Sequence, residues 1–68
     1  MDDKLLDSLL DLVRALNQMI TGNKISDNGI RDHAHLIQDF IKLSGISYRL
    51  ELIDGLYHLF DDAGRLLI

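Results

Sequence analysis

Three histidines are the residues of this chain best suited to acid–base catalysis or metal binding. His33 and His35 are two residues apart, so a helix would turn them to different faces and they could not share one metal ion unaided. If the segment around His58 is helical, Asp54 and Asp62 each lie one turn from this histidine, which allows a local histidine–carboxylate contact. We interpret all three as solvated or half-buried histidines. A pH-sensing role is the sharper alternative, because histidine titrates near neutrality.

The polar stretch ITGNKISDNGIRDH, residues 20–33, raises the question of a metal-binding loop. It fails as a calcium loop, because aligning Gly29 with the required glycine places Lys24 at the first ligand position and His35 at the bidentate carboxylate. Asn28-Gly29 is a hairpin signal, but the flanking apolar residues have helical spacing. The stretch is therefore interpreted as the joint between two helices.

The second half of this stretch has the features of a helix start. Ser26 is a favoured N-cap residue, and Asp27 in the first turn suits the helix dipole. Ile25 and Ile30 occupy the two positions of a hydrophobic staple. These residues predict that a helix begins at about residue 27.

Nucleophilic and phosphate chemistry find no support in the sequence. The serines lie on a predicted helix face or at predicted caps, and none is surrounded by a glycine elbow. Gly22 and Gly29 lack the partner glycine and lysine that a phosphate-binding loop needs. We predict a non-enzymatic protein with no catalytic residues, no metal site and no cofactor.

The composition narrows the classes of function further. The 68 residues allow one domain, spanning 1–68, and they include no cysteine, which excludes disulfides and thiolate metal sites. The net charge is −4 and the basic residues are dispersed, so direct nucleic-acid binding is disfavoured. No apolar run approaches the ~20 residues of a membrane span. The N-terminal Met-Asp-Asp does not resemble a signal peptide, so we expect a cytoplasmic protein.

Hydrophobic spacing predicts three helices, at about residues 3–20, 27–43 and 47–62. Gly22, Gly45 and Gly64 are predicted to end them, and Ser47 is a plausible N-cap of the third. Gly55 would then lie inside the third helix, at a cost of ~1 kcal/mol relative to alanine. The predicted fold class is all-α, a small three-helix domain. Its predicted buried residues are Leu9, Leu16, Ile37, Ile41, Ile53 and Phe60.

The apolar stripes are broader than a three-helix monomer requires. On the first helix they cover well over half of the circumference, and soluble monomers rarely expose large apolar patches. A helical homodimer is the expected solution, because one self-complementary patch buries the excess on both subunits. A monomer that reserves the stripe for another protein is the alternative. The predicted dimer-interface or partner-binding residues are Leu6, Leu10, Val13, Leu66 and Leu67.

Aspartates are prominent on the first predicted helix. Asp3, Asp7 and Asp11 stand one turn apart, and Arg14 follows Asp11 by three residues. One interpretation is a solvated helix face that also complements the helix dipole. The functional interpretation is an acidic surface that docks a basic partner protein or imitates nucleic acid.

Three segments resemble a known family, namely LVRALNQMITGNKIS, GIRDHAHLIQDFI and LELIDGLYHLF. Their order is similar to that of the small enterobacterial regulators of biofilm formation and acid resistance (the YmgB/AriR group), also described as two-component-system connector proteins. The resemblance spans about residues 9–60. It implies an all-helical, non-enzymatic dimer that modulates a signalling phosphorelay or a nucleoid-associated regulator through protein contacts.

The leading functional hypothesis is therefore a small regulatory protein that acts by binding another protein. The alternatives are a helical chaperone, a plasmid- or phage-borne inhibitor protein and, less favoured, a dimeric DNA-binding regulator. DNA binding would be recognised by an affinity that falls steeply with salt. Co-folding with a secreted protein would indicate a chaperone.

Overall fold

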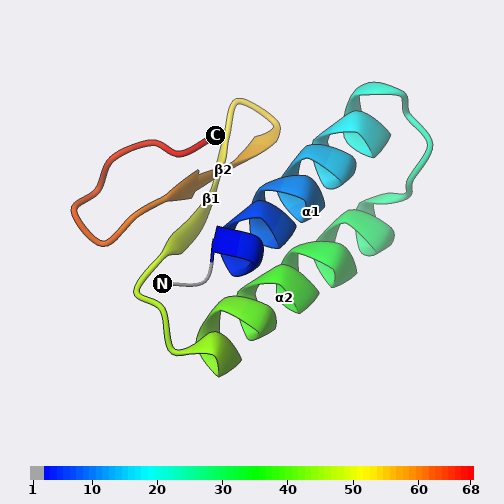
Figure 1. Ribbon diagram of the computed structural model, residues 1–68. Coiled ribbons are helices and arrows are strands. Elements are labelled where there is room, and N and C mark those ends of the chain that lie inside the picture. Colours follow the sequence, from blue (N-terminus) through cyan, green and yellow to red (C-terminus); the bar gives the residue numbers. More distant parts are fainter. Residues whose placement is uncertain (1–2) are drawn as a thin grey trace.

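The protein consists of two helices followed by a β-hairpin, as Figure 1 shows. The computed structural model describes residues 3–68, apart from the side chain of Asp3. Helix α1 is Asp3–Thr21 and helix α2 is Asp27–Ser44. Strands β1, Arg49–Ile53, and β2, Leu56–Phe60, form the hairpin. The predicted all-α, three-helix fold is therefore wrong, although the first two helices are confirmed.

The joint between α1 and α2 is confirmed as a helix start rather than a strand or a metal loop. Ser26 is the N-cap, and its hydroxyl accepts a hydrogen bond from the Gly29 N–H at 3.1 Å. A Cβ atom on Gly29 would lie 2.7 Å from Cγ1 of Ile25, so Ile25 folds directly over this glycine. Ile25 packs against the core from there. The Asn28-Gly29 pair thus lies in the first turn of α2, where the glycine allows Ile25 to approach closely, and it does not form a hairpin turn.

The two helix ends differ in how they turn. Gly45 takes the left-handed conformation after α2, with φ 72°, and its N–H donates to the Lys42 carbonyl at 3.2 Å, as predicted. After α1 the left-handed residue is Asn23, with φ 54°, and not Gly22. Asparagine tolerates this conformation better than most residues because its short polar side chain can hydrogen-bond locally. The helix thus ends directly before Gly22, as predicted, but the left-handed cap expected at this glycine is taken by Asn23.

The segment predicted as a third helix is a hairpin with the turn Asp54-Gly55. Both turn residues have positive φ, 54° and 84°, which is the pattern of a type I′ turn. The strands pair antiparallel from Arg49 opposite Phe60 to Ile53 opposite Leu56. This turn is favoured because its twist matches that of the strands, and a helix through Gly55 would have no such gain.

The C-terminal tail, residues 61–68, returns along the other edge of β2. Leu67 N–H donates to the Leu59 carbonyl at 2.8 Å, and Leu59 N–H donates to the Ile68 carbonyl at 3.4 Å. An isolated bridge joins Phe60 to Leu66. Strand β2 consequently lies between β1 and the tail.

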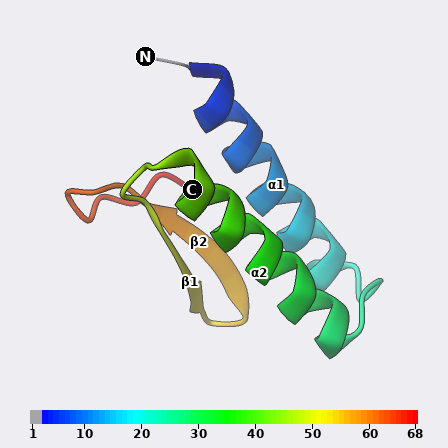
Figure 2. The ribbon, with the colours of Figure 1, turned by 90° about the horizontal axis from the view of Figure 1, so that it is seen from below.

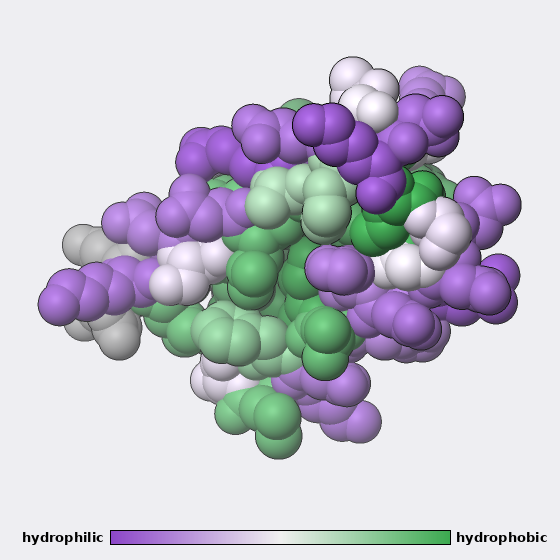
Figure 3. Space-filling model, turned by 90° about the vertical axis from the view of Figure 1, so that its right-hand side faces the viewer, coloured by the Kyte–Doolittle hydropathy of each residue, from purple (hydrophilic) through white to green (hydrophobic). Residues whose placement is uncertain are grey.

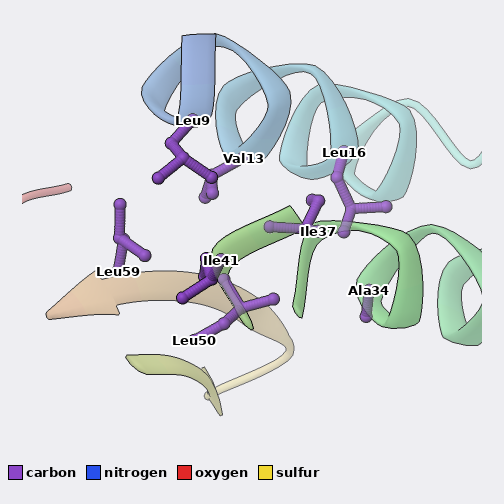
Figure 4. Packing of buried hydrophobic residues seen from close by; sticks show 8 residues of the cluster. All are labelled: Leu9, Val13, Leu16, Ala34, Ile37, Ile41, Leu50 and Leu59. Carbon is purple, nitrogen blue, oxygen red and sulfur yellow. The ribbon is translucent and has the colours of Figure 1, made fainter. Parts of the chain in front are cut away.

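The helices form one layer and the hairpin the other. Figures 1 and 2 show α1 and α2 side by side and antiparallel, with the hairpin on one side of them. Helix α1 packs mainly on β2, and α2 on β1. The core lies between the layers, and Figure 4 shows its side chains converging from all four elements. Its buried residues are Leu9, Val13, Leu16, Ala34, Ile37, Ile41, Leu50 and Leu59.

The predicted core residues on the helices are confirmed, and those on the third element are not. Leu9, Leu16, Ile37 and Ile41 are all buried. Phe60 is only half-buried, and Ile53 is 42% exposed. Both lie on the hairpin face that is turned away from the helices, because strand side chains alternate between faces and Leu50 and Leu59 take the inner one.

Candidate functional site

The histidines are separate and make local backbone contacts. His33 and His35 are exposed, and Nδ1 of His33 donates to the Gly29 carbonyl at 2.9 Å. Half-buried His58 donates from Nδ1 to the Ile68 carbonyl at 3.2 Å. The predicted one-turn spacing to aspartates does not exist on a strand, where Glu51 is the residue opposite His58. No group of three or more metal-ligating residues occurs among the residues that the structure describes.

Asp61 organises the turn between β2 and the tail. Its Oδ1 accepts hydrogen bonds from the N–H groups of Ala63 at 3.0 Å and Arg65 at 2.8 Å, and its Oδ2 accepts from Nε of Arg65 at 3.1 Å. The Arg65 N–H lowers the pKa of the Asp61 carboxyl below its usual value of 3.8. Burial opposes this change, and the Arg65 side chain and the Ala63 N–H add to the lowering. The carboxylate therefore holds the turn that leads into the tail.

The lowered pKa of Asp61 predicts a pH dependence of stability. The stabilising effect is fully present above the unfolded pKa near 3.8 and is lost as pH falls through the lower folded pKa. At neutral pH, Asp61→Asn should therefore unfold at lower urea concentration than the wild type, and this difference should shrink as pH falls below 3.8. Urea midpoints measured across this range test it. A difference that stays constant down to the most acidic pH would contradict the assignment.

An exposed apolar surface lies on the helix layer, on the side opposite the hairpin. Leu12 on α1 is 42% exposed, and Leu36 and Leu43 on α2 are 64% and 88% exposed. Leu36 and Leu43 are two turns apart on the same side of α2. Figure 3 views the molecule from the side of the helices and shows a band of hydrophobic residues that reaches the lower edge, with hydrophilic residues on either side of it. We call Leu12, Leu36 and Leu43 the helix-face patch.

The predicted interface residues do not form one surface. Val13 is fully buried in the core and is not accessible to a partner. Leu6 is half-buried, and Leu10 and Leu67 are half-buried and pack against the same core. Leu66, at 60% exposure, is the member that is open to solvent. In the single chain, the predicted residues on α1, namely Leu6, Leu10 and Val13, are thus buried or half-buried.

The predicted acidic surface is partly neutralised. Asp7 and Asp11 are exposed on α1, whereas the side chain of Asp3 lies outside the described residues. Asp11 forms an ion pair with Arg14 at 3.4 Å. An exposed pair of this kind contributes little to stability, about 0–1 kcal/mol. It also reduces the negative charge that a basic partner would meet.

A groove of about 520 Å³ separates α2 from β1. Ile41 and Ile46 contribute apolar surface to it, and Asp39 and Lys42 place opposite charges at its helical side. From β1 and the residue before it come Tyr48, Arg49, Leu50 and Glu51. The groove therefore runs beside the edge of β1 that faces away from β2.

Asn17 is a functional residue of the fold that the sequence analysis did not identify. Its side-chain NH₂ donates to the Tyr57 carbonyl at 2.8 Å, and its side-chain oxygen accepts from the Tyr57 N–H at 2.8 Å. The Asn17 side chain thus makes the two backbone hydrogen bonds with Tyr57 that a neighbouring strand would otherwise make. The sequence signal was a polar residue between the apolar residues of helix 1, at helical spacing from Val13 and Ile20.

Comparisons with known proteins add no family to this description. No protein-family model matches the chain, and no curated protein or solved structure is detectably similar to it. Across residues 3–68, neither helix has the length and apolar character needed to cross a lipid bilayer.

Proposed function

We propose that this chain is a small non-enzymatic regulatory protein that binds an apolar helix of a partner protein on the helix-face patch. The observation that carries the proposal is the exposure of Leu36 and Leu43, 64% and 88%, on a face of α2 that is turned away from its buried residues. Contiguous exposed apolar surface rimmed by polar residues is typical of protein interaction sites. The proposed place of action is the cytoplasm.

The shape of this surface favours a helix as the bound element. The antiparallel helices α1 and α2 lie side by side and form this surface, with Leu12 on α1 and Leu36 and Leu43 on α2. A third helix can lay its own apolar ridge along such a pair, contacting both through residues three, four and seven apart. Partner binding would cover leucines that the hairpin cannot reach.

The resemblance to the enterobacterial biofilm and acid-resistance regulators suggests which partners to examine first. Proteins of a two-component phosphorelay and nucleoid-associated regulators are the classes that this resemblance implies. The hairpin departs from the all-helical domain that the resemblance also implies. A chaperone or an inhibitor would use an exposed apolar face in the same way, so the identity of the captured partner distinguishes these roles.

The test compares wild-type protein with Leu36→Lys/Leu43→Lys. Both leucines are exposed, so the substitutions should alter the stability of the isolated protein by less than ~0.5 kcal/mol each. Proteins captured from the native host by immobilised wild type are identified, purified and titrated against each variant. We expect the double variant to bind at least ~10-fold more weakly, equivalent to ~1.4 kcal/mol.

Leu66→Lys provides the matched control. Leu66 is 60% exposed but lies on the tail, outside the helix-face patch. It should retain wild-type affinity for the purified partner. Equal binding of wild type and the double variant would contradict the proposal. A loss of affinity with Leu66→Lys alone would also contradict it and would show that the partner binds at the tail.

A further inference from the structure

The two outer edges of the hairpin differ in their hydrogen bonding. On β2, Tyr57 bonds to the Asn17 side chain and Leu59 bonds to the tail. These residues stand opposite Leu52 and Leu50 of β1. Since paired residues of an antiparallel ladder alternate, Leu50 and Leu52 also direct their N–H and C=O groups away from the hairpin. Among residues 3–68, those groups have no hydrogen-bond partner.

We infer that a second copy of this chain covers the free edge, with β1 pairing antiparallel to β1 of the other copy around a two-fold axis at Leu50. This inference goes beyond the helix-face patch and does not rest on it. An open strand edge is a template for pairing with another chain, and proteins normally cover or block it. A two-fold pair satisfies the edges of both copies at once.

The charges on β1 select this register. With Leu50 opposite Leu50, Arg49 of each copy stands opposite Glu51 of the other, and both are exposed on the outer face. These are non-hydrogen-bonded positions, where side chains approach most closely and opposite charges stabilise the pairing. In the single chain the same two residues make only a 3.7 Å pair along one strand.

The neighbouring registers are unfavourable. Shifting the axis to Glu51 places Glu51 opposite Glu51, and shifting it to Arg49 places Arg49 opposite Arg49. Like charges directly opposite one another destabilise a strand pair. A register shifted by one residue is also unfavourable. It places a residue whose N–H and C=O face the other copy opposite one whose groups face β2, and it brings side chains of opposite faces of the sheet together.

The apolar side chains fit the same register. Tyr48 of each copy stands opposite Leu52 of the other, on the face that carries Leu50. Leu52 is 58% exposed in the single chain, whereas Tyr48 and Leu50 line the groove between α2 and β1. Pairing therefore brings an exposed leucine against the mouth of an apolar groove in the other copy.

The experiment exchanges the two charges. Sedimentation equilibrium over micromolar concentrations should show the wild type rising from 7.7 kDa to twice that mass. Arg49→Glu and Glu51→Arg each place two like-charged pairs across the axis, and each should lose the dimer mass where the wild type is dimeric. The double variant Arg49→Glu/Glu51→Arg restores opposite charges and should recover the dimer. Circular dichroism confirms that all variants are folded.

Mixing the single variants gives a stricter test. Arg49→Glu carries two acidic residues and Glu51→Arg two basic ones, so each variant complements the other across the axis but not itself. An equimolar mixture should therefore form a heterodimer, although neither variant dimerises alone. A wild type that stays at 7.7 kDa overturns the inference. So does a dimer that is insensitive to these charges, or single variants that fail to associate when mixed. None of these outcomes affects partner binding at the helix-face patch.

Discussion

Replacing Leu59 by alanine should destabilise the fold by about 2–5 kcal/mol, the range measured for buried leucines. Leu59 is 0% exposed and lies on β2, the strand between β1 and the tail. Figure 4 shows its side chain directed from the sheet towards Leu9 and Val13 of α1. The substitution removes the contact through which the hairpin and α1 share one core. A domain with a free energy of unfolding of ~5–15 kcal/mol would lose a large part of its stability.

Urea unfolding followed by far-ultraviolet circular dichroism measures this loss. The matched control is Leu36→Ala, which makes the same chemical change at a leucine that is 64% exposed. It should shift the free energy of unfolding by less than ~0.5 kcal/mol. If the two variants unfold at the same urea concentration, Leu59 does not lie in the core and the hairpin packs differently.

The helices and their joint were predictable because their signals are local. Ser26 and Gly45 have side-chain or backbone properties that suit a single position at a helix end, and both take that position in the structure. The apolar residues of each helix, such as Leu9 and Leu16 on α1 and Ile37 and Ile41 on α2, have a spacing that is typical of a helix. Each of these inferences needed fewer than about twenty consecutive residues.

The third element was missed because its apolar residues fit two periods. Leu50, Ile53 and Tyr57 have helical spacing, whereas Leu50 and Leu52 also fall on one face of a strand. Asp54-Gly55 was the deciding signal, since an Asp-Gly pair between apolar segments is a strong short-range mark of a hairpin. The period of the apolar residues was given more weight than the turn, and a glycine in mid-helix was accepted at ~1 kcal/mol.

This error determined how much of the candidate site could be predicted. The sequence predicted that α1 has more apolar surface than a three-helix monomer can cover, but which side stays exposed depends on what the hairpin covers. Leu6 and Leu10 are half-buried, and the exposed leucines of the two helices are Leu12 on α1 and Leu36 and Leu43 on α2. The free edge of β1 was likewise beyond prediction, because it exists only once the segment is a strand.

The contact between Asn17 and Tyr57 is the second place where one side chain should have a large effect. Both hydrogen bonds measure 2.8 Å, and together they join residues 40 positions apart in the sequence. Asn17→Ala leaves the N–H and the C=O of Tyr57 without their partner, and each such buried group costs about 1–3 kcal/mol. Water reaches part of this half-buried site, so we expect a total loss of ~2 kcal/mol rather than the full sum.

Hydrogen exchange at a single amide separates this effect from a general loss of helix stability. In Asn17→Ala the Tyr57 amide should exchange much faster than in the wild type, whereas the control Gln18→Ala, at an exposed neighbouring position, should leave it protected. Asn17→Asp adds a finer test, because a carboxylate accepts from the Tyr57 N–H but cannot donate to its carbonyl. It should keep part of the protection and still lose stability. Unchanged exchange at Tyr57 in all three variants would show that the tail and β1 hold β2 in place without α1.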